Sequence, residues 1–300
     1  MQIEIIANPI AGGGKSAPAI ETVKRILDSE KETYSIHWTQ FPGHGKEIAS
    51  ELEPQSGMIV AVGGDGTVME VLNGVSSQET RVGIIPAGMG NDLARCLGIP
   101  EEINRATKVL THGQRAKIDL GSDDGELFNF MGVGFPADVV RNVEKIRNGF
   151  TRGKPVYLIG LLRSISNLSS YDVKLEIDGE LKTSRASAVF VASCRYTGGG
   201  IDLIPHADFQ DGLLDVAVIR EVGRLELVMA LRKVYSGNHV DHPKIEFYQA
   251  RSINLETRTG LPEMLDGDLK GSTPSKLTVV PEARSLMVPP ERHFSSKTDS

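Results

Sequence analysis

Residues 58–67, MIVAVGGDGT, constrain the fold more than any other part of the chain. The apolar first half is typical of a buried parallel strand, and three glycines around one aspartate then break the run. Because such a turn has few Cβ atoms, its backbone N–H groups can approach an anion, and the Asp65 carboxylate is available to a metal ion or a hydroxyl group. The segment favours a nucleotide site, although a bare Gly-Gly-x-Gly also occurs at the sharp end of a strand.

Two further glycine-rich turns follow apolar, strand-like runs. They are residues 8–16, NPIAGGGKS, and residues 87–95, AGMGNDLAR. The first is not a P-loop, because Pro9 stands where that motif requires glycine. Neither turn has the GxGxxG spacing of dinucleotide-binding folds. In the second turn, Asn91 or Asp92 is placed to cap the helix that follows.

The first part of the chain, from residue 1 to about residue 121, alternates strand and helix patterns. The expected strands are 3–7, 33–38, 58–62, 82–85 and 116–120, with apolar residues at helical spacing between them. This series predicts a parallel, three-layer α/β nucleotide-binding domain. Ligand sites in such domains lie at the carboxyl ends of the strands, where all three glycine-rich turns are found.

After about residue 121 the pattern changes to a second, antiparallel β-rich domain. Asp123-Asp124-Gly125 and Asp178-Gly179 are typical hairpin turns. Further strands are expected near 172–177, 186–193, 213–219, 251–256 and 276–280, and helices near 137–148, 156–168 and 224–235. We therefore expect domains at 1–121 and 122–282, with residues 283–300 as a candidate for a return to the first domain.

Composition disfavours several functional classes. The 33 Lys and Arg against 39 Asp and Glu give a net charge of −6, which argues against nucleic acid as the main partner. Cys96 and Cys194 lie in apolar surroundings and are expected to be free thiols of a reducing compartment. No apolar run approaches the roughly 20 residues of a membrane span. We expect a cytoplasmic protein, which would have to visit the bilayer surface to act on a lipid.

Seven motifs together resemble the catalytic domain of diacylglycerol and sphingoid lipid kinases, most closely the soluble bacterial branch. The motifs are Asn8-Pro9 with Gly12 to Gly14, GGDGT at 63–67, Pro86 to Asp92, Lys117 to Gly121, NFMGVGFPA at 129–137, PHADFQDGLLDV at 205–216, and LDGD at 265–268. They cover nearly the whole chain in the family's order. The resemblance implies an enzyme that uses Mg²⁺ and ATP to phosphorylate a lipid hydroxyl group, with diacylglycerol as the default acceptor. GGDGT alone is shared with NAD kinases, so an NAD kinase-like enzyme is the alternative.

The same resemblance implies which residues contact the nucleotide. These are Asn8, Gly12, Gly13, Gly14, Thr39, Gly63, Gly64, Asp65, Gly66, Thr67, Val68, Met69, Met89, Asn91, Asp92, Asp119 and Asp268. Met89 replaces the family's threonine, and Asp268 stands where the family has glutamate. These two departures leave a non-catalytic lipid or nucleotide sensor as another alternative.

The resemblance also implies catalytic and metal-binding carboxylates. Asp266 is the expected general base that takes the proton of the attacking hydroxyl group, with Asp65 as a second catalytic carboxylate. Asp208, Asp211 and Leu213 match a structural Mg²⁺ site of the bacterial branch, and oxygen ligands suit this ion. Both Asp-Gly segments could equally be ordinary turns.

Residues 139–170 are basic within an acidic chain, with six Lys or Arg and one Glu. An apolar helical face adjoins these charges. Such a stretch is expected to bind an anionic membrane surface peripherally and transiently, unless it is only a solvated loop. A homodimer is a candidate assembly.

Overall fold

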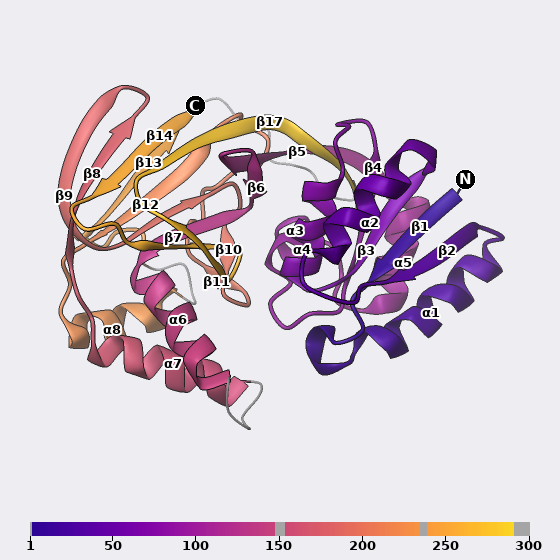
Figure 1. The fold of residues 1–300 in the computed structure, drawn as a ribbon, viewed down its shortest axis with the longest axis horizontal. Helices are drawn as coiled ribbons and strands as arrows, with labels where there is room; N and C mark the ends of the chain where they lie inside the picture. Colours follow the sequence, from indigo (N-terminus) through magenta and orange to yellow (C-terminus); the bar gives the residue numbers. More distant parts are fainter. Residues whose placement is uncertain (1, 148–153, 235–238, 291–300) are drawn as a thin grey trace. The chain divides into compact units, whose positions relative to one another are not determined.

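The computed structural model describes residues 2–147, 154–234 and 239–290, and it divides into two compact units (Figure 1). Unit 1 contains Met1–Ile118 and Arg284–Ser300, and unit 2 contains Asp119–Ala283. The chain passes from one unit to the other within strands β5 (Gln114–Asp123) and β17 (Ser275–Val288). Each of these strands therefore has residues in both units.

Unit 1 is built on a parallel sheet. Its strands are β1 (Gln2–Ala7), β2 (Thr33–Trp38), β3 (Met58–Gly63) and β4 (Arg81–Pro86), in the order β4, β3, β1, β2. Near the C-terminus, Ser285 and Leu286 of β17 pair in parallel with the start of β4. The register sets Ala7 beside Trp38 and Val62, so these strands end at one edge of the sheet.

Helices cover both faces of the sheet, which confirms the three-layer prediction. They are α1 (Ser16–Ser29), α2 (His44–Leu52), α3 (Asp65–Gly74), α4 (Asp92–Cys96) and α5 (Ile103–His112), with 3-10 turns η1 (Ala11–Gly13) and η2 (Glu53–Gln55). Helix α1 packs beside α5, and α2 packs beside α3 (Figure 1). The buried stripe of Ile20, Val23 and Leu27 on α1 has the spacing of one helix face.

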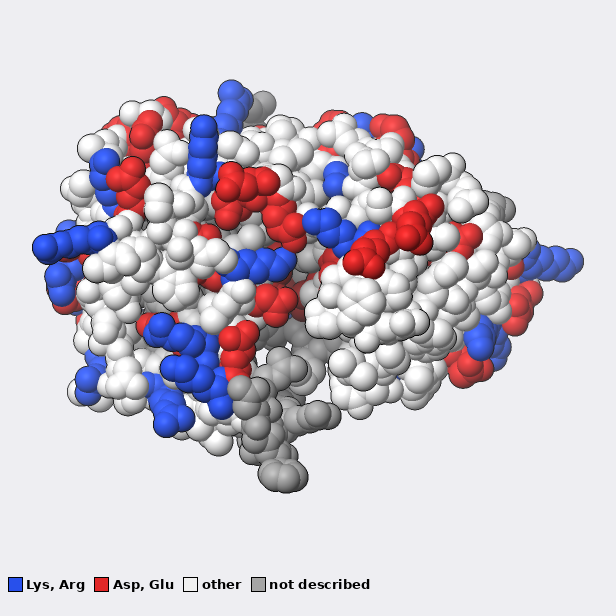
Figure 2. Space-filling view, viewed as in Figure 1, with Lys and Arg blue, Asp and Glu red and all other residues white. Residues whose placement is uncertain are grey.

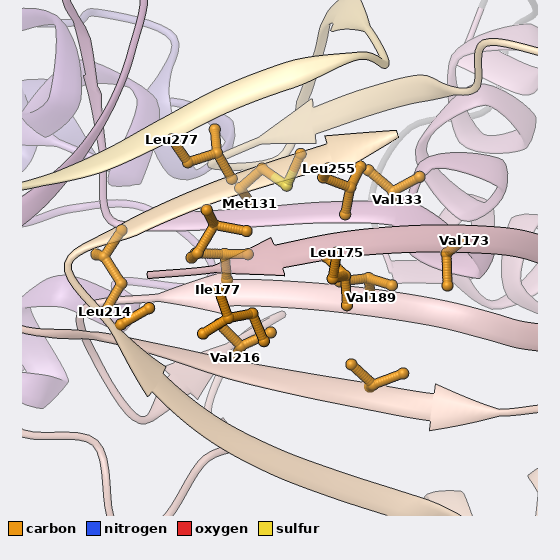
Figure 3. Close-up of a cluster of buried hydrophobic side chains, with 14 of the residues drawn as sticks. Met131, Val133, Val173, Leu175, Ile177, Val189, Leu214, Val216, Leu255 and Leu277 are labelled. Carbon is orange, nitrogen blue, oxygen red and sulfur yellow. The ribbon is translucent and has the colours of Figure 1, made fainter. Parts of the chain in front are cut away.

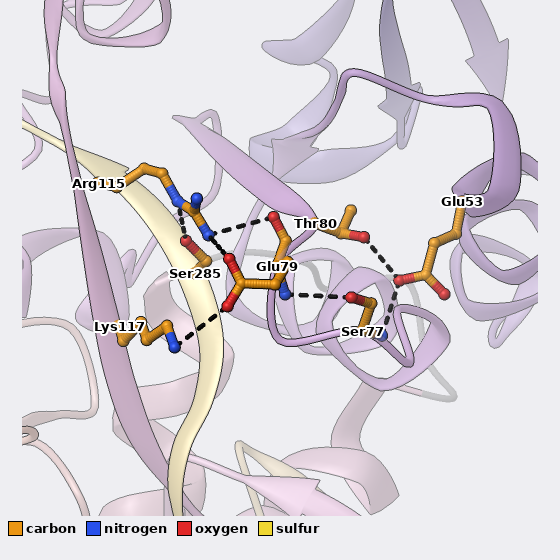
Figure 4. A network of polar contacts seen from close by, with 7 residues as sticks. All are labelled: Glu53, Ser77, Glu79, Thr80, Arg115, Lys117 and Ser285. Atoms are coloured by element: carbon orange, nitrogen blue, oxygen red, sulfur yellow. Dashed lines mark hydrogen bonds and ion pairs between the residues drawn. The ribbon is translucent and has the colours of Figure 1, made fainter.

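A polar network holds the returning C-terminal segment in unit 1 (Figure 4). The Arg115 guanidinium group donates to the Ser285 hydroxyl oxygen at 2.8 Å and pairs with the Glu79 carboxylate, also at 2.8 Å. Lys117 approaches the same carboxylate at 3.2 Å. The carboxylate of Glu53 in turn accepts hydrogen bonds from the 76–80 loop. The loop before β4 and the start of β5 are thereby tied together.

Unit 2 is an antiparallel sheet with helices on one side. Its strands are β6 (Glu126–Phe128), β7 (Phe130–Gly134), β8 (Tyr171–Ile177), β9 (Glu180–Ala192), β12 (Leu214–Arg220), β13 (Ile245–Ala250), β14 (Ser252–Thr257), β15 (Pro262–Leu265) and β16 (Asp268–Ser272), with a short pair β10 (Tyr196–Thr197) and β11 (Ile201–Asp202). Strand β9 is long enough to pair with β8 through its first half and with β7 and β12 through its second half. Both expected Asp-Gly hairpins are present, between β5 and β6 and between β8 and β9.

Both faces of the second half of β9, residues 186–192, are buried in unit 2. Val189 and Val191 belong to a core formed with Leu175, Val216 and Leu255 from the neighbouring strands (Figure 3). The alternate residues of β9 point to the other face, where they join a second core that includes residues of α6. This double burial makes β9 the central strand of the unit.

Three helices complete unit 2: α6 (Phe135–Arg147), α7 (Lys154–Ser166) and α8 (Arg224–Val234). Helices α6 and α7 pack closely because Gly160 lies against Val143, and Asn142 donates to the Ser164 hydroxyl oxygen at 2.8 Å. No helix of the described residues is long and apolar enough to cross a bilayer. Cys96 and Cys194 are buried and are not joined by a disulfide bond.

Candidate functional site

The three glycine-rich turns converge at the carboxyl ends of the parallel strands of unit 1. A Cβ atom on Gly12 would lie 2.2 Å from the Ala87 carbonyl oxygen, and one on Gly88 would lie 2.3 Å from Gly64 Cα. Contacts this close between backbones are open only to glycine. The amide group of Asn8 donates to the Thr67 hydroxyl oxygen at 3.2 Å. Turns that lie far apart in the sequence thus form one backbone surface.

Helix α3 begins at this surface, and within the described residues no side chain other than that of Asp65 caps its first turn. Gly64 is the N-cap residue and makes no side-chain hydrogen bond, while Gly66 in the first turn is exposed. Helix α2 differs, because the Glu70 carboxylate accepts hydrogen bonds from the Gly43 and Gly45 N–H groups at 2.8 and 3.0 Å. An uncapped helix N-terminus beside glycines is suited to bind a phosphate group.

Asp65 has a structural partner that sequence analysis did not foresee. Its carboxylate accepts hydrogen bonds from the N–H groups of Asn91 at 2.8 Å and Leu93 at 3.3 Å, and so caps α4. Burial raises the pKa of this carboxyl group, and the backbone hydrogen bonds oppose that rise. Asn91 occupies the N-cap position of α4, as expected, but its side chain makes no capping hydrogen bond. Asn91 adopts φ of 54° and its side-chain oxygen accepts from the Gly88 N–H group.

The remaining nucleotide residues expected in unit 1 differ in what they offer a ligand. Gly13 and Gly14 are exposed and have open space at their Cα atoms. Val68 and Met69 are buried in the first turns of α3. Thr39 is buried after β2, where its N–H group donates to the Ala7 carbonyl oxygen at 2.9 Å. Met89, in contrast, leaves 73% of its side chain exposed.

In unit 2, Asp266 occupies the turn between β15 and β16. It adopts φ of 48°, and its carboxylate accepts hydrogen bonds from the N–H groups of Asn129 at 3.1 Å and Phe130 at 3.0 Å. These donors fix the orientation of the carboxylate. Asp268 is exposed at the start of β16.

Asp178, in the other Asp-Gly hairpin of unit 2, repeats this geometry. It has φ of 47°, and its carboxylate accepts from the N–H groups of Arg251 and Ser252 at 3.0 and 2.8 Å. Two aspartates of one unit therefore share a left-handed backbone and a pair of backbone donors. Backbone hydrogen bonds to the aspartate side chain thus stabilise both Asp-Gly turns. This geometry by itself therefore does not identify Asp266 as a general base.

Asp119 lies against the loop that contains the expected metal ligands. Its carboxylate accepts from the Gly212 N–H group at 2.7 Å, and its own N–H group donates to the Phe209 carbonyl oxygen at 2.7 Å. Burial raises the pKa of Asp119, and the negative charges of Asp211 and Asp208 raise it further, against the effect of two backbone hydrogen bonds. The structure thus brings three predicted carboxylates together in unit 2.

Asp215 completes this acidic group and was not predicted. Its side chain is fully buried, and one carboxylate oxygen, Oδ2, has no hydrogen-bond partner among the described residues. Burial, with the charge of Asp211, raises the pKa of Asp215 to about 7. The only signal in the sequence was an acidic residue within the apolar run of β12.

An orphaned buried oxygen beside further acids fits a cation-binding loop. Within the described residues, however, no three acidic, His or Cys side chains are close enough to form a metal site by themselves. Backbone carbonyl groups, such as that of Leu213, and water would therefore have to supply ligands, as Mg²⁺ commonly requires.

Glu263 is a second buried acid that the sequence did not reveal. It lies on β15, and its carboxyl group accepts a hydrogen bond from the Ser275 hydroxyl group. A second hydrogen bond joins it to the carboxyl group of Asp123. Burial raises the pKa of Glu263 to about 7, and the negative charge of Asp123 adds to the rise. The hydrogen bonds of Glu263 to Ser275 and Asp123 tie the hairpin that carries Asp266 to β17 and β5.

Two family models match successive parts of the chain. Residues 2–122 match the diacylglycerol kinase catalytic domain. Residues 129–288 match the YegS C-terminal NAD kinase beta sandwich-like domain. Together the two models cover both units.

Curated relatives match over nearly the full length. A diacylglycerol kinase of Staphylococcus epidermidis is 27% identical over 295 residues, covering 95% of this chain and 91% of the relative. A diacylglycerol kinase of Bacillus subtilis is 26% identical over 294 residues, covering 96% of each chain.

Solved structures share the fold. The crystal structure of a diacylglycerol kinase from Bacillus anthracis strain Sterne has a TM-score of 0.76 at 25% identity and covers 96% of this chain and 97% of its own. Another crystal structure from the same strain reaches a TM-score of 0.83 at 27% identity, covering 96% and 95%.

Proposed function

Because the chain belongs to the diacylglycerol kinase catalytic-domain family, in its soluble bacterial branch, we propose that it transfers the γ-phosphoryl group of ATP to a lipid hydroxyl group. Diacylglycerol is the default acceptor. The observation that carries the proposal is the backbone surface of unit 1, where three glycine-rich turns meet beside the uncapped N-terminus of α3. Phosphoryl transfer depends mainly on positioning and on charge stabilisation, which backbone donors of this kind supply.

The proposed roles divide between the two units. In unit 1, the N–H groups around Gly64 and Gly66 bind the ATP phosphates. In unit 2, the Asp266 carboxylate takes the proton of the lipid hydroxyl group as that oxygen attacks phosphorus, and ADP leaves. The hydrogen bonds from Asn129 and Phe130 keep the carboxylate from rotating.

A divalent metal is proposed at two places. Mg²⁺ bound with ATP would neutralise charge on the phosphates. A second Mg²⁺ would be held by Asp208, Asp211 and the carbonyl oxygen of Leu213, next to the buried Asp215 oxygen that has no partner. There it would balance the negative charge of the acidic group.

The test is a transfer assay with ATP labelled at the γ-phosphate. Purified protein and Mg²⁺ are incubated separately with diacylglycerol, a sphingoid base and NAD. We expect label in a chloroform-soluble phospholipid from diacylglycerol, and no label in NAD. Label in NAD alone would contradict the proposal. ATP binding by calorimetry without any labelled product would instead support the sensor alternative, for which the exposed Met89 is the motivating departure.

An NAD kinase-like activity is the second candidate. It is favoured by one observation, the match of residues 129–288 to a domain described as NAD kinase-like. The NAD arm of the transfer assay decides between the two acceptors.

A further inference from the structure

Helices α7 and α8 of unit 2 expose six large apolar side chains. These form what we call the α7–α8 apolar face: Leu158, Ile159 and Leu162 on α7, and Leu225, Val228 and Met229 on α8, with exposed fractions from 44% for Val228 to 81% for Leu225. Single exposed apolar residues are ordinary on a protein surface. Six of them on two helices that contact each other form a patch, and such patches mark interaction surfaces.

The orientation of α7 follows from its buried side. Val156, Gly160 and Ser164 recur every four residues and are buried. Gly160 and Ser164 contact α6 through Val143 and Asn142. Leu158 and Leu162 lie on the opposite side of the helix and Ile159 lies beside them, so these exposed side chains do not contribute to the core of unit 2. Their apolar character therefore has no explanation in folding.

Helix α8 has the same arrangement. Its buried residues Leu227 and Val234 lie on one side of the helix, and the exposed residues Leu225 and Met229 lie on the opposite side. Figure 1 shows α7 and α8 next to each other at the lower edge of unit 2. The two outward faces are therefore parts of one surface of the unit.

The charge around this face is positive. Arg163 and Arg224 are exposed, and neither guanidinium group forms an ion pair with any described residue. Helix α7 has two basic and no acidic residues, and α8 has three basic and one acidic, although the chain as a whole carries −6. The single acid, Glu226, is paired with Lys244 at 2.7 Å. Basic side chains also gather over this part of unit 2 in Figure 2.

We propose that the α7–α8 apolar face docks the protein on an anionic lipid bilayer. The apolar side chains enter the boundary between headgroups and acyl chains, while Arg163 and Arg224 meet the anionic headgroups. The proposal rests on the proposed function, because a lipid acceptor lies in a membrane. It extends the expectation for residues 139–170 by adding α8. Of that segment's charges, Arg152 lies outside the described residues, and the side chains of Arg147 and Lys154 are not described.

The test measures binding to vesicles in the absence of ATP. Vesicles of 30% phosphatidylglycerol and 70% phosphatidylcholine are sedimented with the parent protein and with the double variant Leu162→Glu/Leu225→Glu. Because two exposed apolar anchors become negatively charged, we expect at least a tenfold weaker affinity. The matched control is Leu181→Glu, which changes a side chain of 55% exposure in the β8–β9 hairpin and should bind like the parent.

A variant without the two arginine charges measures the electrostatic contribution to vesicle affinity. Arg163→Gln/Arg224→Gln should bind several-fold more weakly than the parent at 100 mM salt, and the difference should shrink at 500 mM salt because of screening. Affinity equal to the parent in the Leu162→Glu/Leu225→Glu variant would overturn the proposal. So would a parent dimer that this variant converts to a monomer in light scattering, since the face would then bind a second copy of the chain.

Dioctanoylglycerol, a short-chain acceptor used below its aggregation limit, distinguishes this proposal from the proposed function. Phosphorylation at the parent rate in a Leu162→Glu/Leu225→Glu variant that no longer binds vesicles supports the docking surface. Phosphorylation together with unchanged vesicle binding overturns the surface and leaves the kinase standing. Vesicle binding by the parent without phosphorylation of any lipid contradicts the proposed function and supports the surface as a membrane contact.

Discussion

Units 1 and 2 present polar groups in opposite ways. Unit 1 offers backbone N–H groups around glycines, and its best placed carboxylate, Asp65, is used to cap α4. Unit 2 offers carboxylates, of which Asp215 and Glu263 are buried and have a pKa of about 7. The first arrangement suits an anion such as a polyphosphate, and the second suits protons or cations. The comparison predicts that variants of unit 1 change nucleotide binding, while variants of unit 2 change proton-dependent behaviour.

The largest expected effect is the stability difference between two glycine variants of unit 1, one at a crowded position and one at an open position. Gly88→Ala should destabilise the protein by about 3 kcal/mol, the upper end of the cost of overpacking, because the new Cβ would collide with Gly64. Gly66→Ala has open space and a helical position, so its stability should hold or rise by up to about 1 kcal/mol. Urea unfolding measures both changes.

The Gly66→Ala variant also tests whether the first turn of α3 contacts the ATP phosphates. If backbone approach is what binds ATP, Gly66→Ala should weaken ATP binding at least tenfold in calorimetry although the protein is as stable as the parent. Parent-like ATP affinity in Gly66→Ala would show that the first turn of α3 does not contact the phosphates.

The next effect concerns protons in unit 2. Glu263 keeps its proton in the folded state up to a pKa of about 7, whereas the unfolded carboxyl group ionises near its ordinary value of 4.5. The folded state therefore binds more protons between these values, so stability falls as pH rises through this window. Glu263→Gln removes this loss, and relative to the parent it should gain on the order of 2 kcal/mol between pH 5 and pH 8. A pH-independent difference between the two proteins in urea unfolding would contradict the assigned proton.

A smaller effect is expected at Asp65. Asp65→Asn retains one acceptor oxygen but loses the charge that caps α4, so we expect a loss of about 1 kcal/mol. ATP affinity decides whether the carboxylate has a second role. Weaker Mg·ATP binding would support the predicted contact with the nucleotide, whereas affinity equal to the parent would leave Asp65 as a helix cap alone.

Strands β3 and β4 of unit 1 were the most predictable, because both are buried, mainly apolar runs that lead into a glycine-rich turn. The strands β7, β10, β11, β13, β15 and β16 were missed. Strand β7 contains Gly132 and Gly134, β15 begins with Pro262 and buries Glu263, and β16 is mostly exposed and polar, so none shows clear alternation. Such strands form because their neighbours in the sheet supply partners, which local pattern does not reveal.

The site was predictable to a similar degree. Glycine turns leave a mark in the sequence because only glycine permits the contacts that Gly12 and Gly88 make. The hydrogen-bond partners of the carboxylates could not be predicted from the sequence. Asp65 accepts from N–H groups in another turn, and Asp266 accepts from the N–H groups of Phe130 in β7 and of Asn129 before it. Burial of Asp215 and Glu263 likewise depends on the assembled sheet.

The most direct measurement compares turnover of Asp266→Asn with that of Asp178→Asn. Both variants alter an aspartate of an Asp-Gly hairpin with the same left-handed backbone and two N–H donors, so both should lose similar stability. If Asp266 is the base in unit 2 and unit 1 binds the nucleotide, Asp266→Asn should lower kcat for diacylglycerol by at least a hundredfold and keep ATP affinity within a few-fold. Asp178→Asn should keep kcat near the parent value. Equal kcat in the two variants would contradict the division of roles between the units.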